Sequence, residues 1–230
     1  MRSPGCVVAS RVRRGGASGA KRRDPGRAAG PAKLRGSTRA ASDGRRASGS
    51  RANPRAASRR APVAGPVRIL FLDLDGTLTD GVIGYDTHGD FRDFYVRDGL
   101  ALDWAKGLGM LPVVISGRAS ASGELRMQDL ALEHYLGERD KVVVAERVLA
   151  REGVAWAQCA MIGDDLPDVA LMKRVGWRIA VADAVAEVRR IAHTVTRTDA
   201  GRGAVREAVE MLLRHNRTWQ RVLERYEVER

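Results

Sequence analysis

Two aspartates stand two positions apart where an apolar run ends, in the sequence DLDGT at residues 73–77. A carboxylate held at such a point can attack phosphorus as a nucleophile. A second carboxylate beside it can give a proton to the leaving oxygen and later take one from water. Gly76 lets the backbone approach a phosphate closely. The residue types therefore indicate phosphoryl chemistry by Asp73 and Asp75, and the simpler alternative is a turn rich in Asp and Gly.

A second acidic cluster, GDDLPD at residues 163–168, also follows an apolar run. Clustered carboxylates suit Mg²⁺, which keeps several waters and takes only a few protein ligands. Asp165 could instead cap a helix, but capping does not account for Asp164 and Asp168 as well. The cluster therefore predicts a metal site, although such oxygen ligands suit Mn²⁺ and Co²⁺ as well as Mg²⁺.

Two further segments carry groups that suit a phosphate. Ser116, Gly117 and Arg118 follow the apolar run 111–115, where a hydroxyl and loop amides can meet phosphate oxygens. Lys141 stands early in a helical pattern, and a half-buried lysine can neutralise both a phosphate and an attacking carboxylate. Each segment also has a simpler explanation when taken alone, which is a helix N-cap for Ser116 and a solvated lysine for Lys141.

Alternating strands and helices must position these groups. Apolar runs at 67–72, 111–115, 158–162 and 177–181 predict strands, and segments with helical periodicity lie between them. This alternation predicts an α/β fold with a Rossmann-like parallel sheet flanked by helices, in which ligands bind at the carboxyl ends of the strands. Shorter strands are expected at 134–136 and 194–196, and helices at 99–108, 119–132, 139–152, 165–175, 184–192, 205–214 and 219–226.

The connection after the first strand is too short for a separate cap domain. Only about 33 residues lie between Thr77 and the second strand, and they hold a predicted β-hairpin at 82–96 and one helix. The segment between Ser116 and Lys141 is also short. A site without a large cap domain needs another cover, and a partner subunit is the candidate.

Taken together and in this order, the motifs resemble the haloacid dehalogenase-like hydrolase superfamily. The resemblance implies that Asp73 is the nucleophile and Asp75 the general acid and base. It implies that the substrate is bound by Thr77, Ser116, Gly117, Arg118 and Lys141. It also implies that Mg²⁺ is bound by Asp73, Asp164 and the backbone carbonyl of Asp75, with Asp165 and Asp168 supporting these groups.

Longer matches resemble the cap-less 3-deoxy-D-manno-octulosonate 8-phosphate phosphatases. They are DLDGTLTDG at 73–81, FYVRDGL at 94–100, ISGR at 115–118, GDDLPD at 163–168 and GAVRE at 203–207. The resemblance spans about 67–226 and implies a homotetramer in which hairpins pack together and a neighbour covers each site. It also places Arg118 and residues 201–203 near the substrate. Thr77 replaces a frequent valine, and Ala200 stands where many relatives have glycine.

The leading hypothesis is a magnesium-dependent phosphatase that hydrolyses a sugar-acid phosphate through an aspartyl-phosphate intermediate. Alternatives are a phosphatase of another small phosphate, such as a nonulosonate 9-phosphate, or a regulatory subunit that keeps the fold without turnover. Arg92, Arg97 and Arg118 could recognise a substrate carboxylate. For Arg92 and Arg97, a solvated hairpin face is the simpler interpretation.

The positive charge of the chain is concentrated at its start. Residues 1–61 carry 17 Lys/Arg and 2 Asp/Glu out of 40 and 28 in the 230-residue chain, so residues 62–230 are slightly acidic. Between Val12 and Val63 the only large aliphatic residue is Leu34, and so small an apolar content predicts disorder. It could be an inert tail or misassigned start, a transit peptide, or a nucleic-acid-binding arm. Residues 62–230 are expected to form the phosphatase domain.

The location and partners of the protein can also be predicted from composition. No apolar run is long enough to span a bilayer, so no membrane partner is expected. The chain has two cysteines, Cys6 and Cys159, which suits a reducing cytoplasm. Binding to nucleic acid is expected only if the basic segment drives it.

Overall fold

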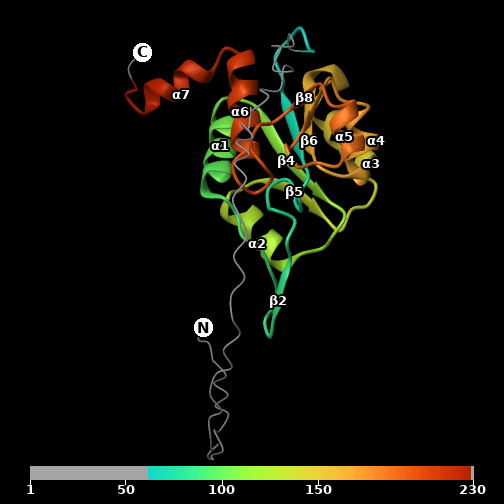
Figure 1. Cartoon of the computed structure of the whole chain (residues 1–230). Coiled ribbons are helices and arrows are strands. Elements are labelled where there is room, and N and C mark those ends of the chain that lie inside the picture. Colours follow the sequence, from blue (N-terminus) through green and yellow to red (C-terminus); the bar gives the residue numbers. More distant parts are fainter. Residues whose placement is uncertain (1–61, 229–230) are drawn as a thin grey trace, which may run out of the picture. The chain divides into compact units, whose positions relative to one another are not determined.

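A six-stranded parallel sheet forms the centre of the computed structural model, which describes residues 62–228 (Figure 1). Its strand order is β5-β4-β1-β6-β7-β8, which confirms the expected sheet. The predicted disorder of residues 1–61 concerns a segment outside the described range. The strands are β1 (Ile69–Leu72), β4 (Leu111–Ser116), β5 (Glu133–Leu136), β6 (Cys159–Gly163), β7 (Trp177–Ala180) and β8 (Thr194–Val195).

The central strand β1 is apolar on both faces and completely buried. Helices cover both faces of such a sheet, so its strands lack the alternation of polar and apolar residues seen in a half-exposed strand. The helices α1 (Val96–Gly107) and α6 (Ala204–His215) lie on one side of the sheet (Figure 1). The other side is covered by α3 (Lys141–Glu152), α4 (Val169–Met172) and α5 (Ala186–Ile191). The remaining helical elements are α2 (Ala121–Asp129), η1 (Trp156–Gln158), η2 (Leu166–Asp168) and α7 (Trp219–Arg225).

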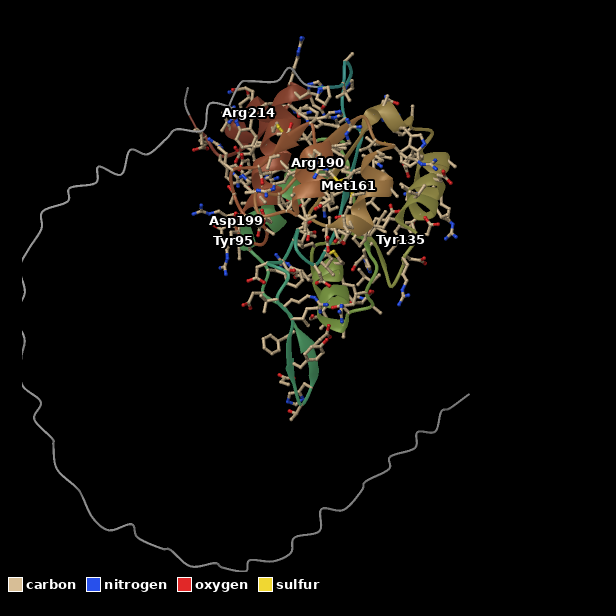
Figure 2. All side chains as sticks on the ribbon, turned by 45° about the vertical axis from the view of Figure 1, so that its right-hand side comes forward. Tyr95, Tyr135, Met161, Arg190, Asp199 and Arg214 are labelled. Carbon is tan, nitrogen blue, oxygen red and sulfur yellow. The ribbon has the colours of Figure 1, made fainter. Side chains whose placement is uncertain are left out.

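A β-hairpin projects from the body between β1 and α1 (Figure 1). It consists of β2 (Gly84–Asp86) paired antiparallel with β3 (Gly89–Phe91). Figure 2 shows its side chains extending away from the ribbon into open space. Val82, Tyr85 and Phe91 are all more than half exposed here. Between β1 and β4 the chain holds only this hairpin and α1, so the expectation that no cap domain stands there is confirmed.

The expected helix over 165–175 is wrong in its first turn. The chain instead forms the 3-10 turn η2 followed by the short helix α4. The cause is Asp168, whose side chain accepts hydrogen bonds from the amides of Asp164 and Asp165 and so folds the turn back onto the end of β6. Pro167 removes a further amide donor from this turn.

Cys159 is the cysteine within the described residues, and it is fully buried in β6. Burial raises the pKa of its thiol to about 12, because a thiolate would lose its hydration in the core. No helix between residues 62 and 228 is both long and apolar enough to cross a bilayer.

Candidate active site

The register of the sheet brings both acidic motifs to the same edge. Leu72, the last residue of β1, pairs with Val114 of β4 and with Ile162 of β6. Asp73 therefore leaves β1 level with Ile115 of β4 and Gly163 of β6, one residue before Ser116 and Asp164. This edge lies at the carboxyl ends of the strands, where parallel sheets bind ligands.

Lys141 joins two carboxylates across this edge. It is the first residue of α3 and is 3% exposed, and its Nζ lies 2.7 Å from Asp73 Oδ1 and 2.7 Å from Asp168 Oδ1. Burial alone would lower the pKa of Lys141, but the two carboxylates outweigh it, so the pKa is raised. Lys141 is therefore a fixed positive charge beside the expected nucleophile, and the solvated alternative is wrong.

Asp168 has both of its oxygens occupied by protein donors. Oδ1 accepts from Lys141 at 2.7 Å, and Oδ2 accepts from the amide of Asp164 at 3.0 Å. A side chain at Gly163 would overlap Asp168, so the glycine makes room for this carboxylate. Asp168 thus holds Lys141 and the loop after β6, as the resemblance implies.

The first motif also supports Asp164. Thr77 is completely buried, and its hydroxyl donates to Asp164 Oδ1 at 3.2 Å. The side chain of Thr77, expected to bind substrate, therefore contacts Asp164, an expected metal ligand. Gly76 has a φ of +86°, and a Cβ there would overlap Asp164 Oδ2. Glycine is needed at this position both for the left-handed backbone and for the close approach of Asp164.

The carboxylates of Asp73, Asp164 and Asp168 offer oxygens within 4.8 Å of one another. Burial raises the pKa of Asp73 to about 7, repulsion from Asp168 adds to the rise, and Lys141 opposes it. Burial also raises the pKa of Asp164 to about 7, and Asp73 and Asp168 contribute. The positive charge around these carboxylates is too small to balance them. A divalent cation would supply the missing charge. The oxygen donors fit Mg²⁺. Both oxygens of Asp168 already accept hydrogen bonds from Lys141 and from the loop after β6, so Asp73 and Asp164 are the stronger candidates for metal ligands.

Asp75 faces the hairpin and is held by a buried arginine. Arg92 Nε lies 2.6 Å from Asp75 Oδ1, and Nη2 lies 3.2 Å from Oδ2. Arg92 is 7% exposed, so its interpretation as part of a solvated hairpin face is wrong, whereas Arg97 is exposed as expected. Sequence reasoning missed this pair because the spacing of 17 residues follows the shape of the hairpin and matches no helix or strand repeat.

The remaining expected residues lie around this centre. Ser116 is buried and its hydroxyl accepts from the amide of Arg118 at 3.2 Å, while Gly117 is exposed. The Arg118 side chain is 54% exposed, and its Nε lies 3.8 Å from Asp75 Oδ2. Asp165 is exposed and accepts from the amide of Leu166 at 2.7 Å, so it caps η2.

The segment before α6 lies against the first motif. The amide of Gly201 donates to the Thr77 carbonyl at 3.2 Å, and a Cβ on Gly201 would overlap the Asp80 backbone. Arg202 Nη2 lies 3.4 Å from Asp80 Oδ2. Ala200 is accommodated, since its amide donates to Asp183 Oδ1 at 3.0 Å.

Asp98 is a buried residue whose role the sequence did not reveal. It lies in α1, and its Oδ1 accepts from the amide of Arg206 in the first turn of α6 at 2.7 Å. Gly203, which precedes α6, has no side chain to cap the helix. Asp98 therefore supplies the cap from another helix and fixes the chain that leads back to Gly201.

Comparison with known proteins identifies relatives of this chain. A haloacid dehalogenase-like hydrolase family model matches residues 125–209. The 3-deoxy-D-manno-octulosonate 8-phosphate phosphatase KdsC of Escherichia coli K12 is 38% identical over 149 residues, which are 64% of this chain and 79% of that protein. The chain belongs to the 3-deoxy-D-manno-octulosonate 8-phosphate phosphatase family. KdsC of Yersinia pestis is also 38% identical, over 65% of this chain and 81% of the relative.

Solved structures of this phosphatase family share the fold. The Moraxella catarrhalis phosphatase, in complex with magnesium, phosphate and the sugar acid KDO, is 31% identical and superimposes with a TM-score of 0.67. The match covers 70% of this chain and 93% of that one. The cobalt-bound phosphatase of Haemophilus influenzae is 34% identical with a TM-score of 0.64, covering 66% and 91% of the two chains.

Proposed function

We propose that the protein hydrolyses 3-deoxy-D-manno-octulosonate 8-phosphate to the free sugar acid and phosphate. The observation that carries the proposal is the buried ion pair between Asp73 and Lys141 beside Asp164, at the sheet edge of a chain in this family. The identity to KdsC supports this substrate class. The alternative substrate, another small phosphate ester, shares the same chemistry.

Asp73 is the nucleophile in the proposed reaction. Its oxygen attacks phosphorus, and the ester oxygen leaves as the aspartyl phosphate forms. Lys141, held by Asp168 at 2.7 Å, keeps a positive charge next to Asp73 and to the incoming phosphate. Phosphoryl transfer depends mainly on such positioning and charge neutralisation. Ser116 and the amides of Gly117 and Arg118 are the remaining expected phosphate contacts.

Asp75 is the proposed acid and base. Its carboxyl group gives a proton to the leaving ester oxygen. It then takes a proton from the water that attacks the aspartyl phosphate, which frees phosphate and restores Asp73. With a side chain that is 21% exposed, Asp75 can reach both the leaving group and water.

Mg²⁺ is the proposed cofactor. Asp73, Asp164 and the backbone carbonyl of Asp75 would hold it, and Thr77 and Gly76 would keep Asp164 in place. When bound, the ion offsets the charge of the phosphate and of the carboxylate that attacks it. The relatives solved with magnesium and with cobalt support a divalent cation at this site.

A homotetramer in the cytoplasm is also proposed. The support for assembly is the projecting hairpin, where Val82 is 68% and Tyr85 69% exposed. Apolar side chains gathered on a projecting element are typical of a protein–protein interface. A neighbouring subunit seated there would cover a site that has no cap domain between β1 and β4.

The experiment that tests the function is phosphate release from 3-deoxy-D-manno-octulosonate 8-phosphate by the full chain with Mg²⁺. A nonulosonate 9-phosphate and other sugar phosphates serve as competing substrates, and Asp73→Asn is the matched inactive variant. We expect preference for the octulosonate ester and a loss of at least about 10³-fold in kcat for the variant. Preference for another ester would show that the proposed substrate is wrong and would leave the proposed phosphatase reaction in place. Folded, metal-loaded protein without turnover on any ester would favour a regulatory subunit instead.

A further inference from the structure

Arg92 is a buried cation for which the mechanism above has no role. Its side chain is fully buried, whereas that of its partner Asp75 is 21% exposed. The guanidinium meets Asp75 as a fork, with Nε 2.6 Å from Oδ1 and Nη2 3.2 Å from Oδ2. Such two-point contacts fix the plane of a carboxylate as well as its distance.

The same guanidinium is anchored on its other side. Arg92 Nη1 contacts the carboxylate of Asp90 and donates to Ser120 Oγ at 2.6 Å and to Ser122 Oγ at 3.1 Å. Ser120 is itself fixed, because its hydroxyl caps α2 by accepting from the amide of Gly123 at 2.9 Å. Arg92 is therefore held by the hairpin and by the start of α2, independently of Asp75.

Arg92, which is held in place by the hairpin and α2, thus contacts Asp75, the group that must act on the substrate. We propose that Arg92 is a positioning residue that sets the orientation of the Asp75 carboxyl group toward the leaving oxygen and then toward the attacking water. The inference rests on the proposed function, since it gives Asp75 the acid and base role. Arg118 also lies near Asp75, with its Nε 3.8 Å from Oδ2, but its side chain is 54% exposed and donates to the exposed Tyr85 hydroxyl at 3.4 Å, so it is held less firmly than Arg92.

The two chemical steps depend on Asp75 in different ways. In the first, the Asp73–phosphorus bond forms, the ester bond breaks, and the Asp75 proton goes to the leaving oxygen. In the second, water attacks phosphorus, its proton goes to Asp75, and the bond to Asp73 breaks. An alkoxide leaving group needs the proton of the first step, whereas a nitrophenolate leaves without it. A misplaced Asp75 should therefore slow the first step for alkyl esters only.

The test compares kcat/KM for 3-deoxy-D-manno-octulosonate 8-phosphate and for p-nitrophenyl phosphate in Arg92→Met. This constant reports the steps up to formation of the aspartyl phosphate, so it isolates the first use of Asp75. We expect a fall of about 100-fold for the sugar ester, the usual size of a general-acid contribution, and a fall of less than about fivefold for the aryl ester. With p-nitrophenyl phosphate, the first step is spared while the second step still needs Asp75, so aspartyl phosphate should accumulate during turnover, as measured by mass spectrometry after an acid quench.

Two further variants keep the test decisive. Arg92→Lys retains the charge without the fork, so it should fold and show an intermediate loss for the sugar ester only. Ser122→Ala removes one anchor but leaves the Asp75 contact, and the ratio between the two substrates should stay within about threefold of wild type. Equal losses on both substrates in Arg92→Met and Arg92→Lys would show that Arg92 only stabilises the hairpin and would overturn the proposal. Wild-type protein inactive on both esters would overturn the proposed function, and this inference with it.

Discussion

Gly76 shows how a missing side chain can be a requirement of the site. Its φ of +86° and its contact with Asp164 both exclude a Cβ. Gly109 has nearly the same backbone, with a φ of +82°, but a Cβ there would meet nothing within 4 Å. A comparison of the two glycines therefore separates the cost of a left-handed backbone from the cost of moving Asp164, the proposed metal ligand.

We expect Gly76→Ala to weaken Mg²⁺ binding by at least about tenfold, because Asp164 must move away from Asp73. Gly109→Ala should bind Mg²⁺ normally and lose only about 1 kcal/mol of stability from backbone strain. Isothermal titration of Mg²⁺ and thermal unfolding of both variants give the comparison. Equal metal affinities in the two variants would contradict the role of Asp164 as a ligand.

Among the elements, α1 and α6 are coupled by Asp98. Burial raises the pKa of Asp98 to about 6, and the hydrogen bond from the Arg206 amide opposes the rise. The folded protein therefore holds a proton on Asp98 more tightly than the unfolded chain, whose aspartates titrate near 3.9. The contribution of Asp98 to stability is thus greatest at low pH and decreases as the pH rises through about 6.

Replacing Asp98 by Asn should remove this pH dependence. We expect the free energy of unfolding of the wild type, relative to that of Asp98→Asn, to increase by about 1 kcal/mol between pH 7 and pH 5. Urea unfolding of both proteins at several pH values measures the difference. Parallel pH profiles for the two proteins would show that Asp98 titrates alike in the folded and unfolded states.

The elements also show what a sequence can and cannot predict. Apolar runs such as β1 predicted the parallel sheet, and the motifs after them predicted that Asp73 and Asp164 lie at one edge of it, because parallel strands all end at the same edge. The contact of Arg92 with Asp75 depends on how the hairpin folds back, and the contact of Asp98 with Arg206 joins residues 108 positions apart. No local pattern encodes such contacts. The helix over 165–175 was wrong because Asp168 binds backbone amides that a regular helix would orient differently.

At the scale of the whole molecule, the proposed tetramer depends on the hairpin. A charge at Val82, which is 68% exposed, would have to be buried if subunits pack there, at the cost of its hydration. We expect Val82→Asp to give smaller species in light scattering and lower activity per subunit at micromolar concentration. Val195→Asp, at the exposed β8 edge of the sheet, is the matched control and should assemble normally. An unchanged mass for Val82→Asp would exclude the hairpin as the assembly surface.

The buried thiol of Cys159 has a practical consequence for labelling. Maleimides and iodoacetamide react with thiolates that they can reach, and this thiol is enclosed in β6 with a pKa near 12. We therefore expect Cys159 not to react with these reagents while the protein is folded. In a Cys6→Ser background, a cysteine placed on the hairpin would carry a fluorophore at one chosen position, and its emission would follow the approach of a neighbouring subunit in real time.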